Sequence, residues 1–212
     1  MNMEKKFELT DNFIINAFGV KLFQIKCTKS FKYAKEGDLG GYVEKDENLD
    51  QESDAWVSGD AQVSGNAWVY GDAQVSGNAR VYGDAWVYGN ARAYGDAWVS
   101  GNAQVSGNAE VSGNAEVYGD AWVSGDAWVS GNADIENNNN HCGFDCFGSC
   151  NRHTHAYLTK DNKVEITCGC FRGSIEEFEK KVEKTHSGKI YEKQYKAIIN
   201  VIKIKFGLTD LI

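Results

Sequence analysis

An unbroken six-residue repeat occupies the middle of this 212-residue chain. Thirteen hexads follow one another from Ala55 to Asn132, nearly all of the form Ala-x-Val-(Ser or Tyr)-Gly-(Asn or Asp). Ala and Val alternate with variable residues, which is the period-2 pattern of a short strand with its small side chains pointing inward. Gly followed by Asn or Asp supplies a corner, because these residues tolerate positive φ. A repeat of this kind predicts a solenoid.

Three strands and three corners make a triangular coil of 18 residues. The pattern resembles the left-handed parallel β-helix of hexapeptide-repeat proteins, and degraded hexads place its start near Tyr42. Residues 43–138 then form about five coils stacked at the ~4.8 Å spacing of paired strands. We therefore predict a mainly β chain with a short N-terminal β cap over residues 1–42. A C-terminal α+β domain, made of a hairpin and two helices, is expected over residues 139–212.

The corner residues test the 18-residue register. Positions 60 to 132 hold six Asp and seven Asn, and no two Asp are 18 residues apart among them. Like charges stacked on successive coils repel, which explains this avoidance. Asp54 below Asp72 is the exception, and it lies in the irregular first coil.

The same register predicts which side chains face outward. All six tryptophans of the chain lie at outward positions of the repeat. One face combines the residues expected to bind a partner, namely Trp68, Tyr70, Trp86, Tyr88 and Trp122. Trp and Tyr are preferred interface anchors, and soluble monomers seldom expose so much aromatic surface. The alternative is that the rings ladder along the coil or lie under the terminal domains. Self-association and a foreign partner are both open.

Charge is concentrated in the repeat. The net charge of the chain is −8, and residues 55–134 carry nine acidic and two basic side chains, a net charge of −7. Such a segment repels phosphates, so we expect no direct contact with nucleic acid. It attracts a protein with a basic surface instead.

The repeat lacks the residues of the enzymes that share its fold. Hexapeptide-repeat acyltransferases use a histidine from the coils, and the related zinc carbonic anhydrases use several, whereas residues 43–138 contain neither His nor Cys. We therefore expect a protein that is not an enzyme.

Cysteines cluster after the repeat. Five of the six cysteines are candidate ligands of a structural zinc ion, which prefers four N or S ligands. They are Cys142, Cys146, Cys150, Cys168 and Cys170, with His141, His153 and His155 among them. Their spacing is not that of a standard zinc finger, so buried free thiols and disulfide or redox chemistry are the alternatives. Cys27, far from the others, is expected to be a buried thiol.

A hairpin decides which of these residues meet. A two-residue turn at Asp161-Asn162 would pair His155 with Cys168 and His153 with Cys170. A three-residue turn at 160–162 would instead place the apolar side chains and Cys168 on one face. We favour the second register, which leaves the histidines in solvent. Ser174 and Glu177 then form the capping box of a first helix, and a second helix is expected from about Ile190 to Lys205.

We expect no export or membrane signal in this chain. No apolar run reaches the ~18 residues that a membrane span needs. Acidic residues stand near the N-terminus, where a secretion signal would be apolar. We expect a cytoplasmic protein without a membrane partner.

A broader resemblance covers nearly the whole chain. The stretch GDLGGYVEKDENL before the repeat, together with the terminal TKDNKVEITCGCFRGSIEEFEKKVEKTH, is similar to a family of uncharacterised phage and prophage solenoid proteins. Small acidic phage proteins include anti-CRISPR inhibitors, which bind the basic surfaces of RNA-guided nucleases. The resemblance implies a phage-encoded protein in the host cytosol, but the family brings no settled activity with it. By analogy with those inhibitors, and from the acidic repeat, the outward tryptophans and the missing catalytic residues, we expect a protein that binds and blocks a host protein, with a CRISPR effector as one candidate. A self-assembling structural phage protein and, more weakly, a zinc-dependent enzyme are the other hypotheses.

Overall fold

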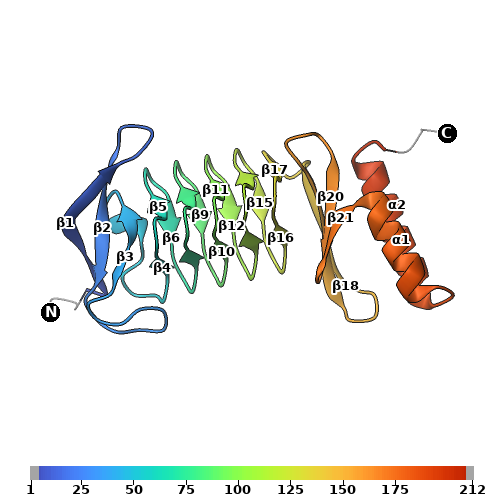
Figure 1. Ribbon diagram of the computed structural model, residues 1–212, viewed down its shortest axis with the longest axis horizontal. Helices are drawn as coiled ribbons and strands as arrows, with labels where there is room; N and C mark the ends of the chain where they lie inside the picture. Colours follow the sequence, from blue (N-terminus) through green and yellow to red (C-terminus); the bar gives the residue numbers. More distant parts are fainter. Residues whose placement is uncertain (1–4, 209–212) are drawn as a thin grey trace.

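The computed structural model describes residues 5–208. Three parts follow one another along its long axis, as Figure 1 shows: an N-terminal β cap, a solenoid, and a C-terminal sheet covered by two helices. The expected mainly β solenoid of about five coils is confirmed.

Each hexad contributes one two-residue strand, and the strands stack into three parallel sheets. The first sheet contains β5 (Gln62–Val63), β8 (Arg80–Val81), β11 (Trp98–Val99), β14 (Glu116–Val117) and β17 (Asp134–Ile135). The second contains β4 (Trp56–Val57), β7 (Gln74–Val75), β10 (Arg92–Ala93), β13 (Glu110–Val111) and β16 (Trp128–Val129). The third contains β6 (Trp68–Val69), β9 (Trp86–Val87), β12 (Gln104–Val105) and β15 (Trp122–Val123).

The register between coils is 18 residues on every sheet, with Trp68 paired to Trp86 as an example. The Ala and Val positions of the hexads are at most 2% exposed and form one continuous core. Because strand side chains alternate between two faces, the variable residue after each Ala points outward.

Corner side chains form hydrogen-bonded ladders between coils. Asn66 Nδ2 donates to Asp84 Oδ1 at 3.0 Å, and Asn102 Nδ2 donates to Asp120 Oδ1 at 2.9 Å. The Asn102 amide thus separates the carboxylates of Asp84 and Asp120 and donates a hydrogen bond to one of them, whereas stacked aspartates would repel each other. The exception at Asp72 is compensated from the N-terminal cap, where Lys32 Nζ lies 2.8 Å from its carboxylate.

The ladder predicts a cost for extending a run of aspartates. Asn102→Asp removes the donor to Asp120 and places three carboxylates in one column, with Asp84 below. We expect a loss of about 1 kcal/mol in the free energy of unfolding at low salt, shrinking as salt is raised. Asn114→Asp is the control. Residue 114 has only one acidic neighbour in its corner column, Asp96, so this variant should lose less stability. Equal losses in urea unfolding of the two variants would contradict the repulsion.

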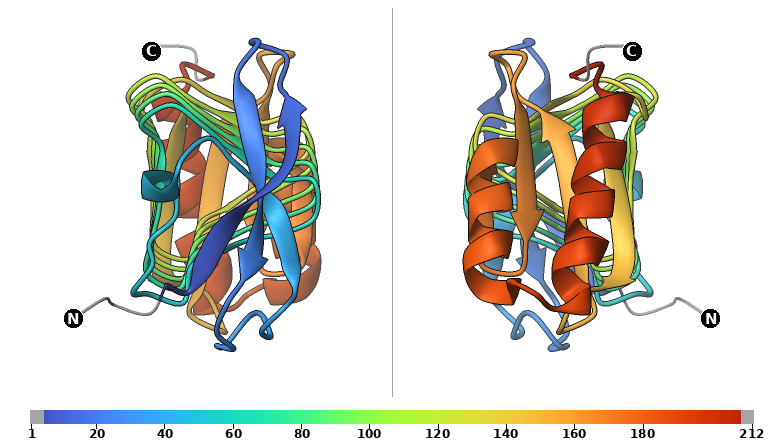
Figure 2. Two further views of the ribbon diagram at one scale, coloured as in Figure 1. Left: turned by 90° about the vertical axis from the view of Figure 1, so that its left-hand side faces the viewer. Right: turned by 90° about the vertical axis from the view of Figure 1, so that its right-hand side faces the viewer.

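The N-terminal cap is continuous with the solenoid. Its antiparallel strands are β1 (Phe7–Ile15), β2 (Lys21–Cys27) and β3 (Leu39–Val43), and β3 pairs in parallel with β5. A short 3₁₀ helix, η1 (Asp46–Asn48), interrupts the first coil. The cap crosses the near end of the solenoid in the left view of Figure 2. Cys27 is a buried free thiol, as expected.

The C-terminal sheet contains β18 (His141–Phe147), β19 (Arg152–Leu158), β20 (Val164–Cys168) and β21 (Phe171–Ser174). Leu158 pairs with Val164, which is the register of the three-residue turn. One face carries Ala156, Ile166 and Cys168 toward the helices. The favoured register is therefore confirmed.

Two helices cover that apolar face, as the right view of Figure 2 shows. They are α1 (Ile175–His186) and α2 (Ile190–Lys205). The expected capping box starts α1, since Glu177 N donates to Ser174 Oγ at 3.2 Å and Ser174 N donates to the Glu177 carboxylate at 2.9 Å. The bounds of α2 are those expected for the second helix, and the side chains that it buries are Tyr195, Ile198, Ile199 and Ile202.

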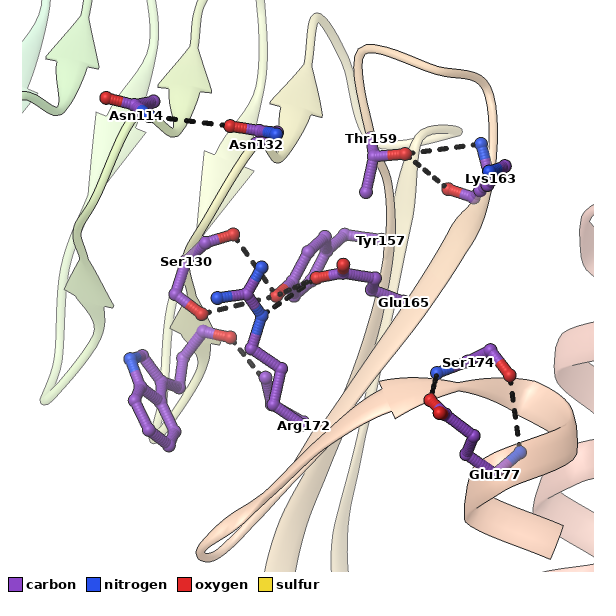
Figure 3. A network of polar contacts seen from close by, with 12 residues as sticks. Asn114, Ser130, Asn132, Tyr157, Thr159, Lys163, Glu165, Arg172, Ser174 and Glu177 are labelled. Carbon is purple, nitrogen blue, oxygen red and sulfur yellow. Dashed lines mark hydrogen bonds and ion pairs between the residues drawn. The ribbon is translucent and has the colours of Figure 1, made fainter.

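The opposite face of the C-terminal sheet packs on the last coil. Figure 3 shows the buried Tyr157, whose hydroxyl donates to the Ser130 carbonyl at 3.3 Å. Thr167 Oγ1 donates to the Trp128 carbonyl at 2.8 Å. Beside them, Arg172 Nε lies 2.9 Å from Glu165 Oε2. The sheet therefore stands between solenoid and helices and covers the end of the repeat.

Candidate functional site

The third sheet of the solenoid carries a row of packed aromatic side chains. We call Trp68, Tyr70, Trp86, Tyr88 and Trp122 the aromatic strip. Trp68 stacks on Tyr70 with ring centroids 4.1 Å apart, and Tyr70 stacks on Tyr88 at 4.9 Å. Trp86 meets Trp68 edge-on at 6.1 Å. The ladder of rings that was the alternative to an interface therefore exists, and it fixes the orientation of four of the five side chains.

The strip is also open to solvent. Trp68, Trp86 and Trp122 are 37%, 41% and 54% exposed, and the two tyrosines are half-buried. Trp122 Nε1 donates to Ser106 Oγ at 3.3 Å, and the Tyr88 hydroxyl donates to Gln104 Oε1 at 3.3 Å. Rings held by neighbours lose little side-chain entropy when a partner covers them. The strip has the composition and rigidity of a protein-binding surface.

Acidic side chains border the strip. Asp84 and Asp120 stand in the corner column along one edge of the third sheet, and Asp126 stands in the column along the other. At the Trp68 end, a depression of about 410 Å³ is lined by Trp68 and the first-coil loop, including four acidic residues: Asp46, Glu47, Asp50 and Glu52. The position of this loop in the coil was not predictable from sequence, because its hexads are irregular. An apolar centre with acidic edges is complementary to a basic protein surface.

The other three tryptophans point outward from the coil but are covered. Trp56 is 5% exposed and packs edge-on against Phe31 of the N-terminal cap, with centroids 5.4 Å apart. Trp98 lies beside Tyr82 and under the Arg80 guanidinium at 5.1 Å. Trp128 lies half-buried under the C-terminal sheet. The structure thus divides the tryptophans between an open strip and covered positions.

The structure does not gather the five candidate cysteine ligands at one point. Cys146, Cys150 and Cys170 are exposed, whereas Cys168 is buried. Burial raises the pKa of Cys142 to about 11, so in the absence of a metal ion its side chain is a thiol at pH 7. Within residues 5–208, no group of three or more His, Cys, Asp or Glu side chains stands ready to hold a metal ion.

Three of these cysteines nevertheless border one cavity. Cys150, Cys168, Cys170 and His186 line a space of about 220 Å³ between the C-terminal sheet and α1. Thr154 Oγ1 donates to Cys168 Sγ at 3.3 Å, and the Tyr195 hydroxyl lies 3.8 Å from the same sulfur. Zinc binding by cysteines stays a prediction, for which these side chains are the nearest set.

The expectation that the histidines are solvated is wrong. His155 is 1% exposed, because the face of β19 opposite the helices packs on the last coil. Burial lowers the pKa of His141 to about 4 and that of His155 well below its ordinary value, so both rings are neutral at pH 7. The alternation His153-Thr154-His155 was a signal for one shared face, but the sequence did not show that the solenoid covers it.

No helix in the described part of the chain is long and apolar enough to cross a membrane.

Comparison with known proteins supports the assignment of the repeat as a β-solenoid. A family model described as the YdcK beta-solenoid repeat matches residues 61–73 and 73–89. The two segments are a small part of the chain, so the match supports a solenoid repeat protein and does not extend to the caps. No curated protein sequence gives a match. The phage origin and the inhibitor role stay predictions.

Proposed function

We propose that this protein is a non-enzymatic binding protein that docks its aromatic strip on a basic surface of another protein. The observation that carries the proposal is the third sheet itself, with three tryptophans more than one-third exposed beside packed tyrosines. Aromatic side chains of this kind supply most of the binding energy in many interfaces. The acidic edges and the −7 charge of the repeat would speed association with a basic partner.

The charge pattern favours a foreign partner over a second copy. Two strips facing each other would bring acidic edges against acidic edges, which costs free energy. Growth end to end is opposed as well, because both ends of the solenoid are covered in the views of Figures 1 and 2. A monomer in light scattering is the expected result. A stable oligomer that the strip variant below disrupts would favour self-assembly.

The resemblance to phage and prophage solenoid proteins makes the proposal more specific. A phage-encoded protein of this kind would act in the cytoplasm of the bacterial host and block a defence protein. An RNA-guided nuclease suits the chemistry, because its nucleic-acid channel is basic and an acidic protein could occupy it. The direct assay adds the protein to such a nuclease and measures DNA cleavage.

Replacing the exposed tryptophans should abolish binding. For Trp68→Ala/Trp86→Ala/Trp122→Ala we expect at least a hundredfold loss of affinity, since each is a candidate hot spot worth ~1–2 kcal/mol or more. Trp98→Ala is the matched control, because it removes a tryptophan from the first sheet. Partners are captured from host lysate with the wild-type protein and then purified. Their affinities for the wild type, the triple variant and Trp98→Ala are compared at low and at high salt.

Two outcomes would contradict the proposal. One is a captured protein whose affinity is unchanged by the triple substitution while circular dichroism shows a folded chain. The other is an affinity that does not fall as salt is raised. Salt screens exposed complementary charges, so binding through the acidic edges must weaken at high salt.

A further inference from the structure

Three of the four histidines lie together between the C-terminal sheet and the last coil. His141 is at the start of β18, opposite Tyr157, and His153 and His155 occupy alternate positions of β19. Since Tyr157 is part of the solenoid core, these positions share the face that packs on the coil. His141 Nδ1 and His155 Nε2 are 2.9 Å apart, and the ring centroids of His153 and His155 are 5.6 Å apart.

The hydrogen-bonding positions around His141 and His155 call for three ring protons, whereas two neutral imidazoles carry only two. Asn138 Oδ1 accepts from Trp122 N at 2.9 Å, so the atom 3.3 Å from His141 Nε2 is an oxygen and requires a proton on that nitrogen. Neutral His141 then presents a lone pair on Nδ1, and His155 must donate from Nε2. His155 Nδ1 is left bare, buried, and without a hydrogen-bond partner in residues 5–208. A buried polar atom in this state costs free energy.

A cation between the two rings would remove this mismatch. Both nitrogens across the 2.9 Å gap would then present lone pairs to it, and His155 would carry its proton on Nδ1. Two imidazole nitrogens bound tetrahedrally to Zn²⁺ are about 3.3 Å apart, so the gap must open by only about 0.4 Å.

His153 offers a third nitrogen. Its side chain is 9% exposed, and its Nε2 is a second buried atom without a hydrogen-bond partner in the described chain. Gly143 makes room for this ring, because a Cβ there would lie 2.8 Å from His153 Nε2 and 3.7 Å from His155 Cδ2. The absence of a side chain at Gly143 thus keeps the His153 nitrogen beside the edge of His155.

The outer nitrogens already have the partners that metal-bound histidines use. His153 Nδ1 lies 2.6 Å from Asp145 Oδ1, and His141 Nε2 faces the Asn138 oxygen. Histidine ligands commonly donate their second N–H to a carboxylate or carbonyl oxygen, which fixes the ring and the tautomer. His153 also borders a cleft of about 410 Å³ that separates the last coil from the sheet and gives a path from solvent.

We propose that His141, His153 and His155 bind one divalent transition-metal ion of the borderline class, such as Zn²⁺. Neutral imidazoles without thiolates suit Zn²⁺, Cu²⁺, Ni²⁺ or Co²⁺ rather than Mg²⁺ or Ca²⁺. The side chains do not yet converge at ligand distances, so binding pulls the three rings together. The ion then cross-links β18, through His141, to β19, through His153 and His155, beside the last coil.

The test is a Co²⁺ titration of the untagged, chelator-treated chain under reducing conditions, followed by competition with Zn²⁺. We expect one Co²⁺ per chain, with visible d–d bands and no thiolate charge-transfer band. His141→Ala and His153→Ala should each weaken binding at least a hundredfold. Asp145→Asn keeps all three rings and should weaken binding about 10- to 100-fold.

Gly143→Ala separates metal binding from folding, since its added methyl group occupies the space beside His153 Nε2 while every ligand remains. We expect weaker Co²⁺ binding by a chain that is still folded by circular dichroism. His186→Ala, which removes the histidine outside the cluster, should bind like the wild type. Failure of the wild-type chain to bind Co²⁺ would overturn the proposal. So would binding that shows a thiolate band and is lost on replacing Cys150, Cys168 and Cys170 by serine.

Discussion

Gly101→Ala should destabilise the solenoid more than a corner substitution that meets no neighbouring coil. Gly101 has φ +65°, which costs an alanine about 1–2 kcal/mol. Its added Cβ would also lie 2.8 Å from the backbone nitrogen of Gly119 on the next coil. That backbone is fixed by the bond from Asn102 N to the Gly119 carbonyl at 2.8 Å. We expect a total loss of about 3 kcal/mol, which lowers the Tm by roughly 6–12 °C.

Gly125→Ala separates the two causes. Gly125 has φ +70°, but a Cβ there would have no heavy atom within 4 Å among the described residues. It therefore bears only the conformational cost of about 1–2 kcal/mol. Urea unfolding of both variants measures the difference. Equal losses would show that contact between stacked corners contributes nothing.

Lys6→Met should detach the N-terminal cap from the first coil. Lys6 is 6% exposed, and its ammonium donates to the carbonyls of Asp50, Ser53 and Ala55 at 2.5, 2.7 and 2.8 Å. Burial lowers its pKa to about 8, so at pH 7 most molecules keep all three N–H donors. Methionine fills similar space but leaves the carbonyls without these donors. We expect a loss of about 3 kcal/mol, because each buried unpaired carbonyl costs about 1–3 kcal/mol and part of this site reaches water.

Lys5→Met is the matched control. Lys5 is adjacent in sequence, yet its ammonium makes an exposed ion pair with Asp46 at 2.5 Å. Exposed pairs contribute little, so this variant should unfold like the wild type. Hydrogen exchange at β1 locates the effect, since Lys6→Met should speed exchange there and leave the later coils protected. Unchanged protection of β1 would contradict a role for Lys6 in holding the cap.

The regular part of the fold was predictable from sequence because its contacts repeat. Each coil contacts its neighbours through the same backbone register, so one hexad determines the strand, the corner and the inward side chains. The pairing of Trp68 with Trp86 and the ladder from Asn102 to Asp120 follow from the period alone. The helices were predictable for a similar reason, since the Ser174 capping box and the apolar spacing of α2 are local signals.

The environment of each outward side chain depended on the tertiary structure. Trp56, Trp86 and Trp128 occupy equivalent hexad positions, yet only Trp86 is exposed, because the terminal caps fold back over the other two. His155 is buried for the same reason, although its own strand pattern indicated a solvated face. The sequence alone therefore determined the backbone of the solenoid, through interactions between residues 18 apart. Which outward residues remain free to bind was decided by packing between distant segments, whose contacts have no fixed sequence separation.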